Sequence, residues 1–165
     1  EASLRGNNVI SHNKITQILR ERCCDGGAIY TIGPQVGSSI HDNYLLQSST
    51  TGIYPAGGNA LYHDRGSGGF LDSNNVVDGN WTHWFGTNPS QGQYGPGAHC
   101  PTISGEEGDC NITITKNFLR TLAGGADPPN NSTIINDNIV INMGSPLPPE
   151  AQIIYENAGV RADEQ

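Results

Sequence analysis

The 165-residue chain has little charge, few basic residues and no long apolar run, and each shortage excludes a class of protein. Charged residues make up 15% of the chain, and only eight are Lys or Arg, so the formal net charge is −8. A chain this poor in basic residues lacks the electrostatic footprint of a nucleic-acid-binding protein. The same balance favours a neutral ligand over a strongly anionic polysaccharide. No stretch approaches the roughly 18 consecutive apolar residues of a transmembrane helix, so we expect no association with a membrane.

Glycine and asparagine are abundant in place of charged and apolar residues. The chain contains 22 Gly and 17 Asn, or 39 of 165 residues. Both residue types tolerate positive φ angles and are common in turns. The backbone must therefore reverse direction often, which argues against a helical bundle and for an all-β protein.

Five segments share one pattern, in which a short apolar stretch is followed by Asn and then by another apolar residue. These asparagines are Asn13, Asn43, Asn74, Asn117 and Asn138, with spacings of 30, 31, 43 and 21 residues. A second pair of segments, Ala28-Ile-Tyr30 and Ala60-Leu-Tyr62, is offset by nearly the same distance. Self-similarity at such a period is the mark of a repeat architecture.

Short strands at a fixed offset, joined by turns of variable length, predict a parallel β-helix of about five coils. Each coil would place one strand about 4.8 Å above the previous one, with Ile, Val and Leu stacked inside. Asparagines at the same bend of every coil would form a ladder of amide hydrogen bonds. A two-sheet sandwich is the alternative, but it requires hairpin signals every 8–12 residues or so and leaves the two offsets unexplained.

The sequence also predicts features at both ends of the chain and in one long insertion. Residues 148–160 predict a short helix with proline at its start, with Ala151, Ile153 and Ile154 toward the core, which would cap the last coil. Residues 78–110 read as a long loop excursion. The amino-terminal end has no covering device, so residues 1–165 are expected to be the carboxyl-terminal part of a β-helix whose upstream coils lie on a separate or missing chain.

The four cysteines favour an oxidising compartment. Cys100 and Cys110 bracket a turn-rich segment, where a disulfide would stabilise the fold by roughly 2–3 kcal/mol. A zinc site is the alternative, but the ligand spacing for zinc is absent, and we expect no metal and no cofactor. Cys23 and Cys24 are adjacent, and one of them is expected to pair with the upstream part, because a bond between neighbouring cysteines is strained.

Four glycosylation sequons also favour an extracellular protein. They begin at Asn80, Asn111, Asn130 and Asn131. Together with the cysteine pair they favour a secreted glycoprotein, although an Asn- and Thr-rich chain produces some sequons by chance.

Three strings resemble secreted right-handed β-helix proteins that act on carbohydrates. They are Asp25-Gly-Gly-Ala-Ile-Tyr-Thr-Ile-Gly-Pro, Ala60-Leu-Tyr-His-Asp-Arg-Gly-Ser-Gly-Gly and Glu156-Asn-Ala-Gly-Val. The resemblance is nearest to glycoside hydrolase family 141, with its fucosidase and xylanase activities, and more distant from the family 120 xylosidases. It implies hydrolysis of a glycosidic bond by a pair of carboxylates, placed by motif on Asp25 and Asp64, in an order that the sequence leaves open.

Side chains around these aspartates and on the long excursion are candidates for binding the sugar. They are Tyr30, Tyr62, His63, Arg65, His83 and Trp84. Aromatic faces combine apolar area with polar edges and suit sugar rings. The alternatives are that both aspartates serve only as turn residues, that Trp81 and Phe85 form a local aromatic cluster, and that the chain is a non-catalytic extracellular rod or glycan-binding module.

Overall fold

The computed structural model describes residues 6–16, 18, 26–48, 58–87, 99–101, 107–109, 111–126 and 133–159. Within these ranges the chain forms fourteen strands and one helix. The strands are β1 (Val9–Ser11), β2 (Lys14–Thr16), β3 (Gly26–His41), β4 (Tyr44–Gln47), β5 (Gly58–Ser73), β6 (Val76–Gly79), β7 (His83–Thr87), β8 (His99–Pro101), β9 (Glu107–Asp109), β10 (Ile112–Thr115), β11 (Phe118–Arg120), β12 (Gly124–Ala126), β13 (Thr133–Asn136) and β14 (Ile139–Val140). The helix is α1 (Pro149–Asn157).

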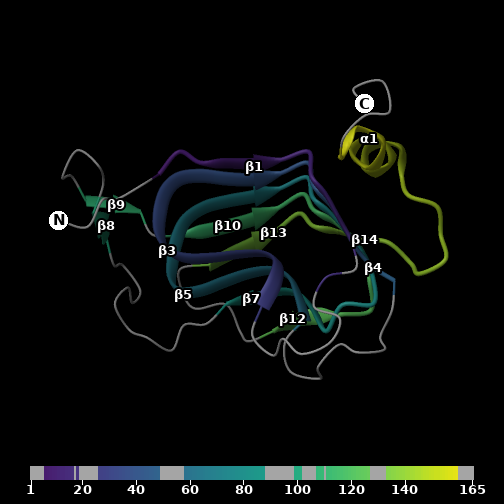
Figure 1. The fold of residues 1–165 in the computed structure, drawn as a ribbon, viewed down its shortest axis with the longest axis horizontal. Helices are drawn as coiled ribbons and strands as arrows, with labels where there is room; N and C mark the ends of the chain where they lie inside the picture. The colour runs from purple at the N-terminus through teal and green to yellow at the C-terminus, as the bar shows by residue number, and fades with distance from the viewer. Residues whose placement is uncertain are drawn as a thin grey trace.

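Two sheets hold most of the strands (Figure 1). The larger sheet has the order β1-β3-β5-β10-β13, with β7 paired to β5 and β12 paired to β7, and the smaller sheet has the order β2-β4-β6-β11-β14. Strands of the two sheets alternate along the chain and give five layers: β1–β2, β3–β4, β5–β6, β10–β11 and β13–β14. All pairings described within these two sheets are parallel. The many strands and the single short helix of the described ranges confirm the all-β class.

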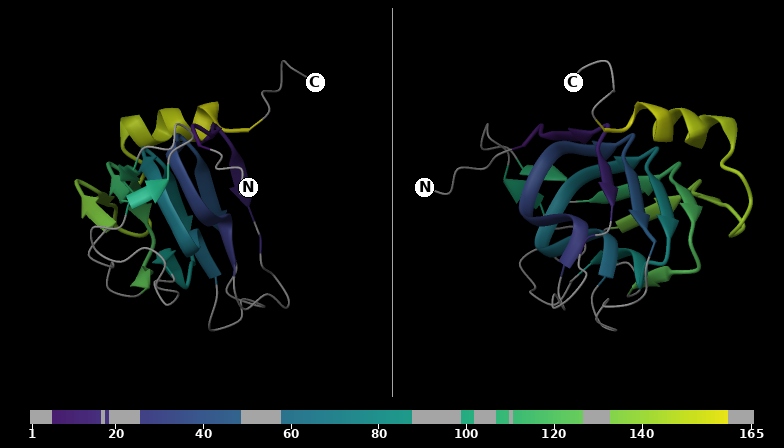
Figure 2. Two further views of the ribbon diagram at one scale, coloured as in Figure 1. Left: turned by 90° about the vertical axis from the view of Figure 1, so that its left-hand side faces the viewer. Right: turned by 45° about the vertical axis from the view of Figure 1, so that its right-hand side comes forward.

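The long strands β3 and β5 bend partway along their length and give the larger sheet its curvature (Figures 1 and 2). The pairing between them shifts on both sides of Pro34. Gly33 and Gly37 adopt φ angles of 77° and 76° at this bend, a conformation that glycine reaches without steric cost. Before the bend β5 pairs with β7, and after it β5 pairs with β10.

The asparagine ladder lies where each layer passes from the larger sheet to the smaller one. Asn43 donates its side-chain amide to Asn75 Oδ1 at 2.9 Å, and Asn75 donates in the same way to Asn117 Oδ1 at 3.0 Å. The ladder continues at both ends, from Asn13 to Asn43 and from Asn117 to Asn138. Asn43, Asn75 and Asn117 are fully buried, so each amide relies on these bonds.

The predicted ladder was wrong at one of its five positions. Asn75 occupies the ladder, and Asn74 precedes it with a φ of 53°. In every layer the residue before the ladder asparagine adopts this left-handed conformation, and we call this set the bend row: His12, Asp42, Asn74, Lys116 and Asp137. Alignment on the apolar residue that follows the ladder, such as Tyr44 or Val76, would have selected Asn75.

The hydrophobic core lies between the two sheets. It contains alternate side chains of the strands, among them Ile40, Leu45, Leu61, Val77 and Ile114, all at most 1% exposed. Burial of this kind contributes roughly 1.5–3 kcal/mol for each large aliphatic side chain.

Helix α1 forms where it was predicted but covers a different surface. Pro149 begins it and Gly159, with a φ of 88°, follows its end. Ala151 and Ile154 pack on Tyr44, Val76 and Phe118, on the outer face of the smaller sheet.

The helix therefore crosses the layers instead of capping the last one (Figure 2). Its C-terminal end reaches the first layer, where the Gly159 N–H donates to the His12 carbonyl at 2.7 Å. Ile153, predicted to face the core, is 57% exposed, because the single buried stripe of this short helix is occupied by Ala151 and Ile154.

The predicted loop excursion at 78–110 is partly strand. His83–Thr87 forms β7, which extends the larger sheet beside β5. After β7, the described residues of the insertion form the antiparallel pair β8–β9.

Candidate functional site

Tyr30, Tyr62 and Asp64 lie together on the outer face of the larger sheet, before the bend. Successive side chains of a strand alternate between its faces, and Ile29 and Leu61 point into the core. Their neighbours Tyr30 and Tyr62 therefore point outward, directly opposite each other in adjacent strands. The structure thus brings together three of the predicted site residues.

A hydrogen bond and a ring contact fix this cluster. The Tyr30 hydroxyl donates to Asp64 Oδ2 at 2.5 Å, and the rings of Tyr30 and Tyr62 meet edge to face, with centroids 5.2 Å apart. Tyr62 and Asp64 are buried, whereas Tyr30 is 39% exposed. The cluster therefore presents one accessible aromatic ring, held in place by a buried carboxylate and a buried ring.

His63 lies on the opposite face from Asp64 and is 2% exposed. Its Nδ1 lies 2.7 Å from Thr31 Oγ1 and its Nε2 lies 2.6 Å from Asp72 Oδ2. Its ring also packs against Phe70 and Phe85. Adjacent residues of a strand face opposite ways, so the structure places His63, a predicted binding residue, on the core side of β5, away from Tyr30, Tyr62 and Asp64.

A polar network that the sequence did not predict links His63 to the backbone carbonyl of Asp64. Thr31 Oγ1 lies 3.0 Å from Ser67 Oγ, and Ser67 in turn donates to the Asp64 carbonyl at 2.6 Å. Asp72 Oδ1 is buried without a hydrogen-bond partner among the described residues. No local motif marks Thr31, Ser67 and Asp72, since they meet only through the pairing and bending of β3 and β5.

The second predicted carboxylate, Asp25, lies outside the described residues, which begin again at Gly26. The pairing of Asp25 with Asp64 as two catalytic carboxylates therefore stays a prediction.

The remaining predicted binding residues have different surroundings. Trp84 is 8% exposed and belongs to the core, with Trp81 and Phe85 beside it. The rings of Trp84 and Phe85 are in contact, with centroids 5.7 Å apart. His83 is half-buried at the start of β7, opposite Asn59, and the side chain of Arg65 lies outside the described part of the structure.

The residues predicted for modification are only partly described. Asn80 is exposed and Asn111 is half-buried, while Asn130 and Asn131 lie outside the described residues. Cys100 is in β8, with Gly108 opposite it. Cys110, Cys23 and Cys24 lie outside the described residues, so the disulfides remain predictions.

A second polar network joins three layers of the smaller sheet. The Tyr44 hydroxyl donates to Asp78 Oδ2 at 2.6 Å, and Arg120 Nε donates to Asp78 Oδ1 at 2.9 Å. Burial, together with the hydrogen bond to Asp78, raises the pKa of Tyr44 above its ordinary value. The hydrogen bond to Asp78 also raises the pKa of Arg120. Both side chains thus keep their protons and hold the Asp78 carboxylate in place.

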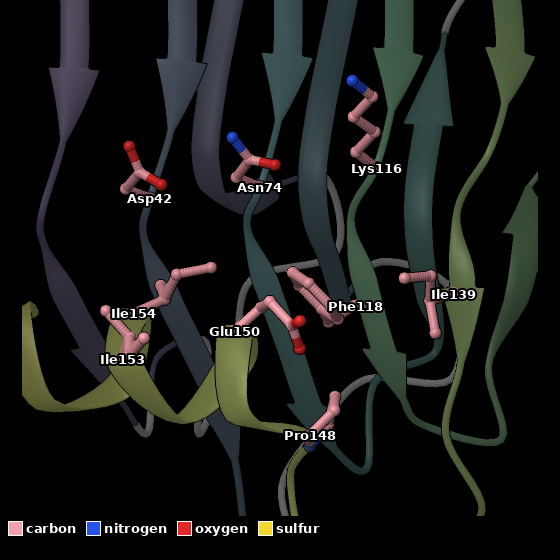
Figure 3. A pocket seen from close by; sticks show the side chains of 9 residues that line it. All are labelled: Asp42, Asn74, Lys116, Phe118, Ile139, Pro148, Glu150, Ile153 and Ile154. Atoms are coloured by element: carbon pink, nitrogen blue, oxygen red, sulfur yellow. The ribbon is translucent and has the colours of Figure 1, made fainter.

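A groove of about 540 Å³ separates α1 from the bend row (Figure 3). Three members of the bend row, Asp42, Asn74 and Lys116, lie along one side, and Glu150 and Ile153 of the helix lie across from them. The remaining lining residues are Phe118, Ile139, Pro148 and Ile154. The groove has mixed charge at its rim and apolar side chains below.

Neither a metal site nor a membrane span is found in the described ranges. No group of three or more His, Cys, Asp and Glu side chains there is placed to hold a metal ion. The single helix found there is too short and too polar to cross a bilayer. No protein-family model, curated protein or solved structure matches this chain.

Proposed function

We propose that this chain forms a right-handed parallel β-helix that binds a neutral carbohydrate on the outer face of its larger sheet. Three features support the β-helix: the alternation of strands between two sheets, the parallel pairing of five successive layers, and the asparagine ladder at one bend.

The observation that carries the binding proposal is the accessible ring of Tyr30. Its hydroxyl is bound to Asp64, and its ring contacts the ring of Tyr62. A sugar ring stacks on an aromatic face that is already fixed, because little conformational entropy is then lost on binding. The net charge of −8 opposes an anionic glycan.

The test is titration calorimetry with neutral oligosaccharides. Tyr30→Ala should abolish binding because it removes the stacking surface, whereas Tyr30→Phe, which keeps the ring, should retain most of it. Tyr155→Ala, on α1, is the matched control and should bind like the parent chain. Equal affinity for the parent chain and Tyr30→Ala would refute this site.

Hydrolysis of the bound glycan is the second candidate, and the burial of Asp64 beside a tyrosine hydroxyl favours it. A buried carboxyl next to a hydrogen-bond donor is a setting in which glycosidases hold a catalytic acid or nucleophile. Turnover of aryl glycosides that is lost in Asp64→Asn would support it. Binding without any turnover, in both chains, would leave the carbohydrate-binding role alone.

Secretion, glycosylation at Asn80 and Asn111, and a Cys100–Cys110 disulfide complete the proposal. The exposed position of Asn80 supports the first of these modification sites. Peptide mass spectrometry of the secreted protein, under non-reducing conditions, would show the glycans and the disulfide directly.

A further inference from the structure

The groove between α1 and the bend row is a second place where a ligand can bind. Its volume of about 540 Å³ falls in the usual range of small-molecule pockets, roughly 300–1,000 Å³. The groove lies on the outer face of the smaller sheet, whereas Tyr30 lies on the outer face of the larger one. A ligand bound here is therefore separate from the proposed carbohydrate, and either site can exist without the other.

Apolar side chains form the floor of the groove and part of its helical wall. Phe118 and Ile154 are buried where the helix packs on the sheet. Ile153 also lines the groove but is 57% exposed. Removal of such a side chain from water is favourable, so the groove suits an apolar group of a ligand.

The opposite wall carries both signs of charge in a fixed order (Figure 3). It presents Asp42, Asn74 and Lys116, one from each of three successive layers. The strands that follow these residues, β4, β6 and β11, pair in register. Neighbouring strands lie about 4.8 Å apart, so the backbones at Asp42 and Lys116 are roughly 10 Å apart, with Asn74 halfway.

The polar groups around the groove have bonding capacity to spare. The side chains of Asn74, Lys116 and Glu150 make no hydrogen bond or ion pair with any residue that the structure describes. Asp42 pairs through Oδ2 with His41 Nδ1 at 2.7 Å, which leaves its Oδ1 for a ligand. A ligand can therefore bind these groups without breaking a contact of the fold.

The order of the charges selects the kind of ligand. A simple amine would pair with Asp42 or Glu150 but would meet the Lys116 ammonium as a like charge. A simple carboxylate would pair with Lys116 but would meet two carboxylates. Only a ligand with a positive end and a negative end matches the whole wall, because each of its ends then meets an opposite charge.

We propose that the groove binds a short apolar peptide with free ends, about three residues long and extended along the layer stack. An extended chain advances about 3.3 Å per residue, so three residues span roughly the 10 Å between Asp42 and Lys116. The peptide ammonium pairs with Asp42, its carboxylate with Lys116, and its central amides with Asn74 and Glu150. Its middle side chain points to the apolar floor, because side chains of an extended chain alternate.

Nuclear magnetic resonance titration of the parent chain with the tripeptide alanyl-phenylalanyl-alanine tests the site. Signals of Phe118, Ile153 and Lys116 should shift and saturate. Acetylation of the peptide amine, or amidation of its carboxylate, should each weaken binding about two- to fivefold, the strength of one exposed ion pair. Phenethylamine and 3-phenylpropionate, which carry the ring with one charge each, should bind more weakly than the tripeptide.

Two results of this titration would overturn the proposal. One is the absence of saturable shifts at these residues. The other is equal affinity for the tripeptide and for its doubly blocked form, or for either single-charge compound, because the paired charges would then play no part. Since these comparisons use the parent chain, they do not depend on the folding of a variant.

Variants of the wall show which residue holds which end of the peptide. In Asp42→Asn, acetylation of the peptide should no longer weaken binding, whereas amidation should still do so. Lys116→Gln should show the reverse. Asp137→Asn, at a bend-row position that does not line the groove, is the matched control and should respond to both modifications like the parent chain. The same loss in Asp137→Asn as in Asp42→Asn would refute the assigned pairing, because only the overall charge would then matter.

Discussion

His63 and Asp72 belong to the same strand, nine residues apart, yet their side chains meet at 2.6 Å inside the core. The contact exists because β5 bends between them, so that its two halves face each other across the core. Asp72 is fully buried and His63 nearly so. The pair thus ties the two halves of the larger sheet together.

Replacing Asp72 should destabilise the fold strongly. Asp72→Ala leaves His63 Nε2 buried without this partner, and we expect a loss of about 2–4 kcal/mol in the free energy of unfolding. Asp72→Asn, which keeps a polar group of the same size, should lose less than half of that. Urea denaturation of the three chains measures both differences, and equal stability of the alanine and asparagine variants would contradict the role given to this contact.

Replacement by glycine should affect the stability of the fold differently at the neighbouring residues Asn74 and Asn75. Asn75→Gly removes a buried amide that bonds to Asn43, Asn117 and the Ile40 carbonyl, and should cost about 2–4 kcal/mol. Asn74→Gly, at a φ of 53°, suits glycine and should be neutral or stabilise slightly. Thermal unfolding of both variants tests the assignment of the ladder, and the reverse ranking would place Asn74 in it.

Gly79 and Gly144 have nearly equal positive φ angles but different surroundings, so replacing each by alanine distinguishes the cost of backbone strain from the cost of a steric clash. A Cβ on Gly79 would lie 2.2 Å from the Gln47 carbonyl oxygen, whereas a Cβ on Gly144 meets nothing within 4 Å. Gly144→Ala should cost only the left-handed strain of about 1–2 kcal/mol. Gly79→Ala should lower the free energy of unfolding clearly more, because β4 and β6 must move apart. Urea denaturation of both variants measures the difference. Similar denaturation midpoints would contradict the steric conflict at Gly79.

The raised pKa of Tyr44 predicts a loss of stability in alkali. An unfolded tyrosine releases its proton from about pH 10, while burial and Asp78 keep the folded Tyr44 protonated above that value. The unfolded state therefore binds fewer protons, and the free energy of unfolding falls as the pH rises above about 10.

Tyr44→Phe removes this contribution without removing the ring. Its free energy of unfolding should fall less between about pH 9 and pH 11 than that of the parent chain. Urea denaturation at both pH values provides the comparison. An identical decrease in the two chains would mean that other groups account for the alkaline sensitivity.

The repeat made much of the fold predictable. The spacing of the asparagines indicated parallel layers, and four of the five ladder positions were correct. Asn74 was chosen over Asn75 because two adjacent asparagines fit the approximate pattern, whereas strict alignment of Val76 with Tyr44 points to Asn75. The helix at Pro149–Asn157 was recognisable from its proline start, but its docking surface was not, because that surface is built from side chains of three different layers.

The candidate site was less predictable than the fold. Tyr30 and Tyr62 lie opposite each other in β3 and β5, as the offset between Ala28-Ile-Tyr30 and Ala60-Leu-Tyr62 indicated. His63 was predicted to bind the sugar beside Asp64, but the structure places the two side chains on opposite faces of β5, and His63 is buried in the core. The network of Thr31, Ser67 and Asp72 gave no signal in the sequence at all.

The amino-acid sequence alone determined the period of the layers and the amide at each bend, because both depend on local spacing and residue type. Tertiary structure decided which side chains meet across the bend of β5 and where α1 docks. These depend on distances between residues far apart in the chain, and local patterns carry no record of those distances.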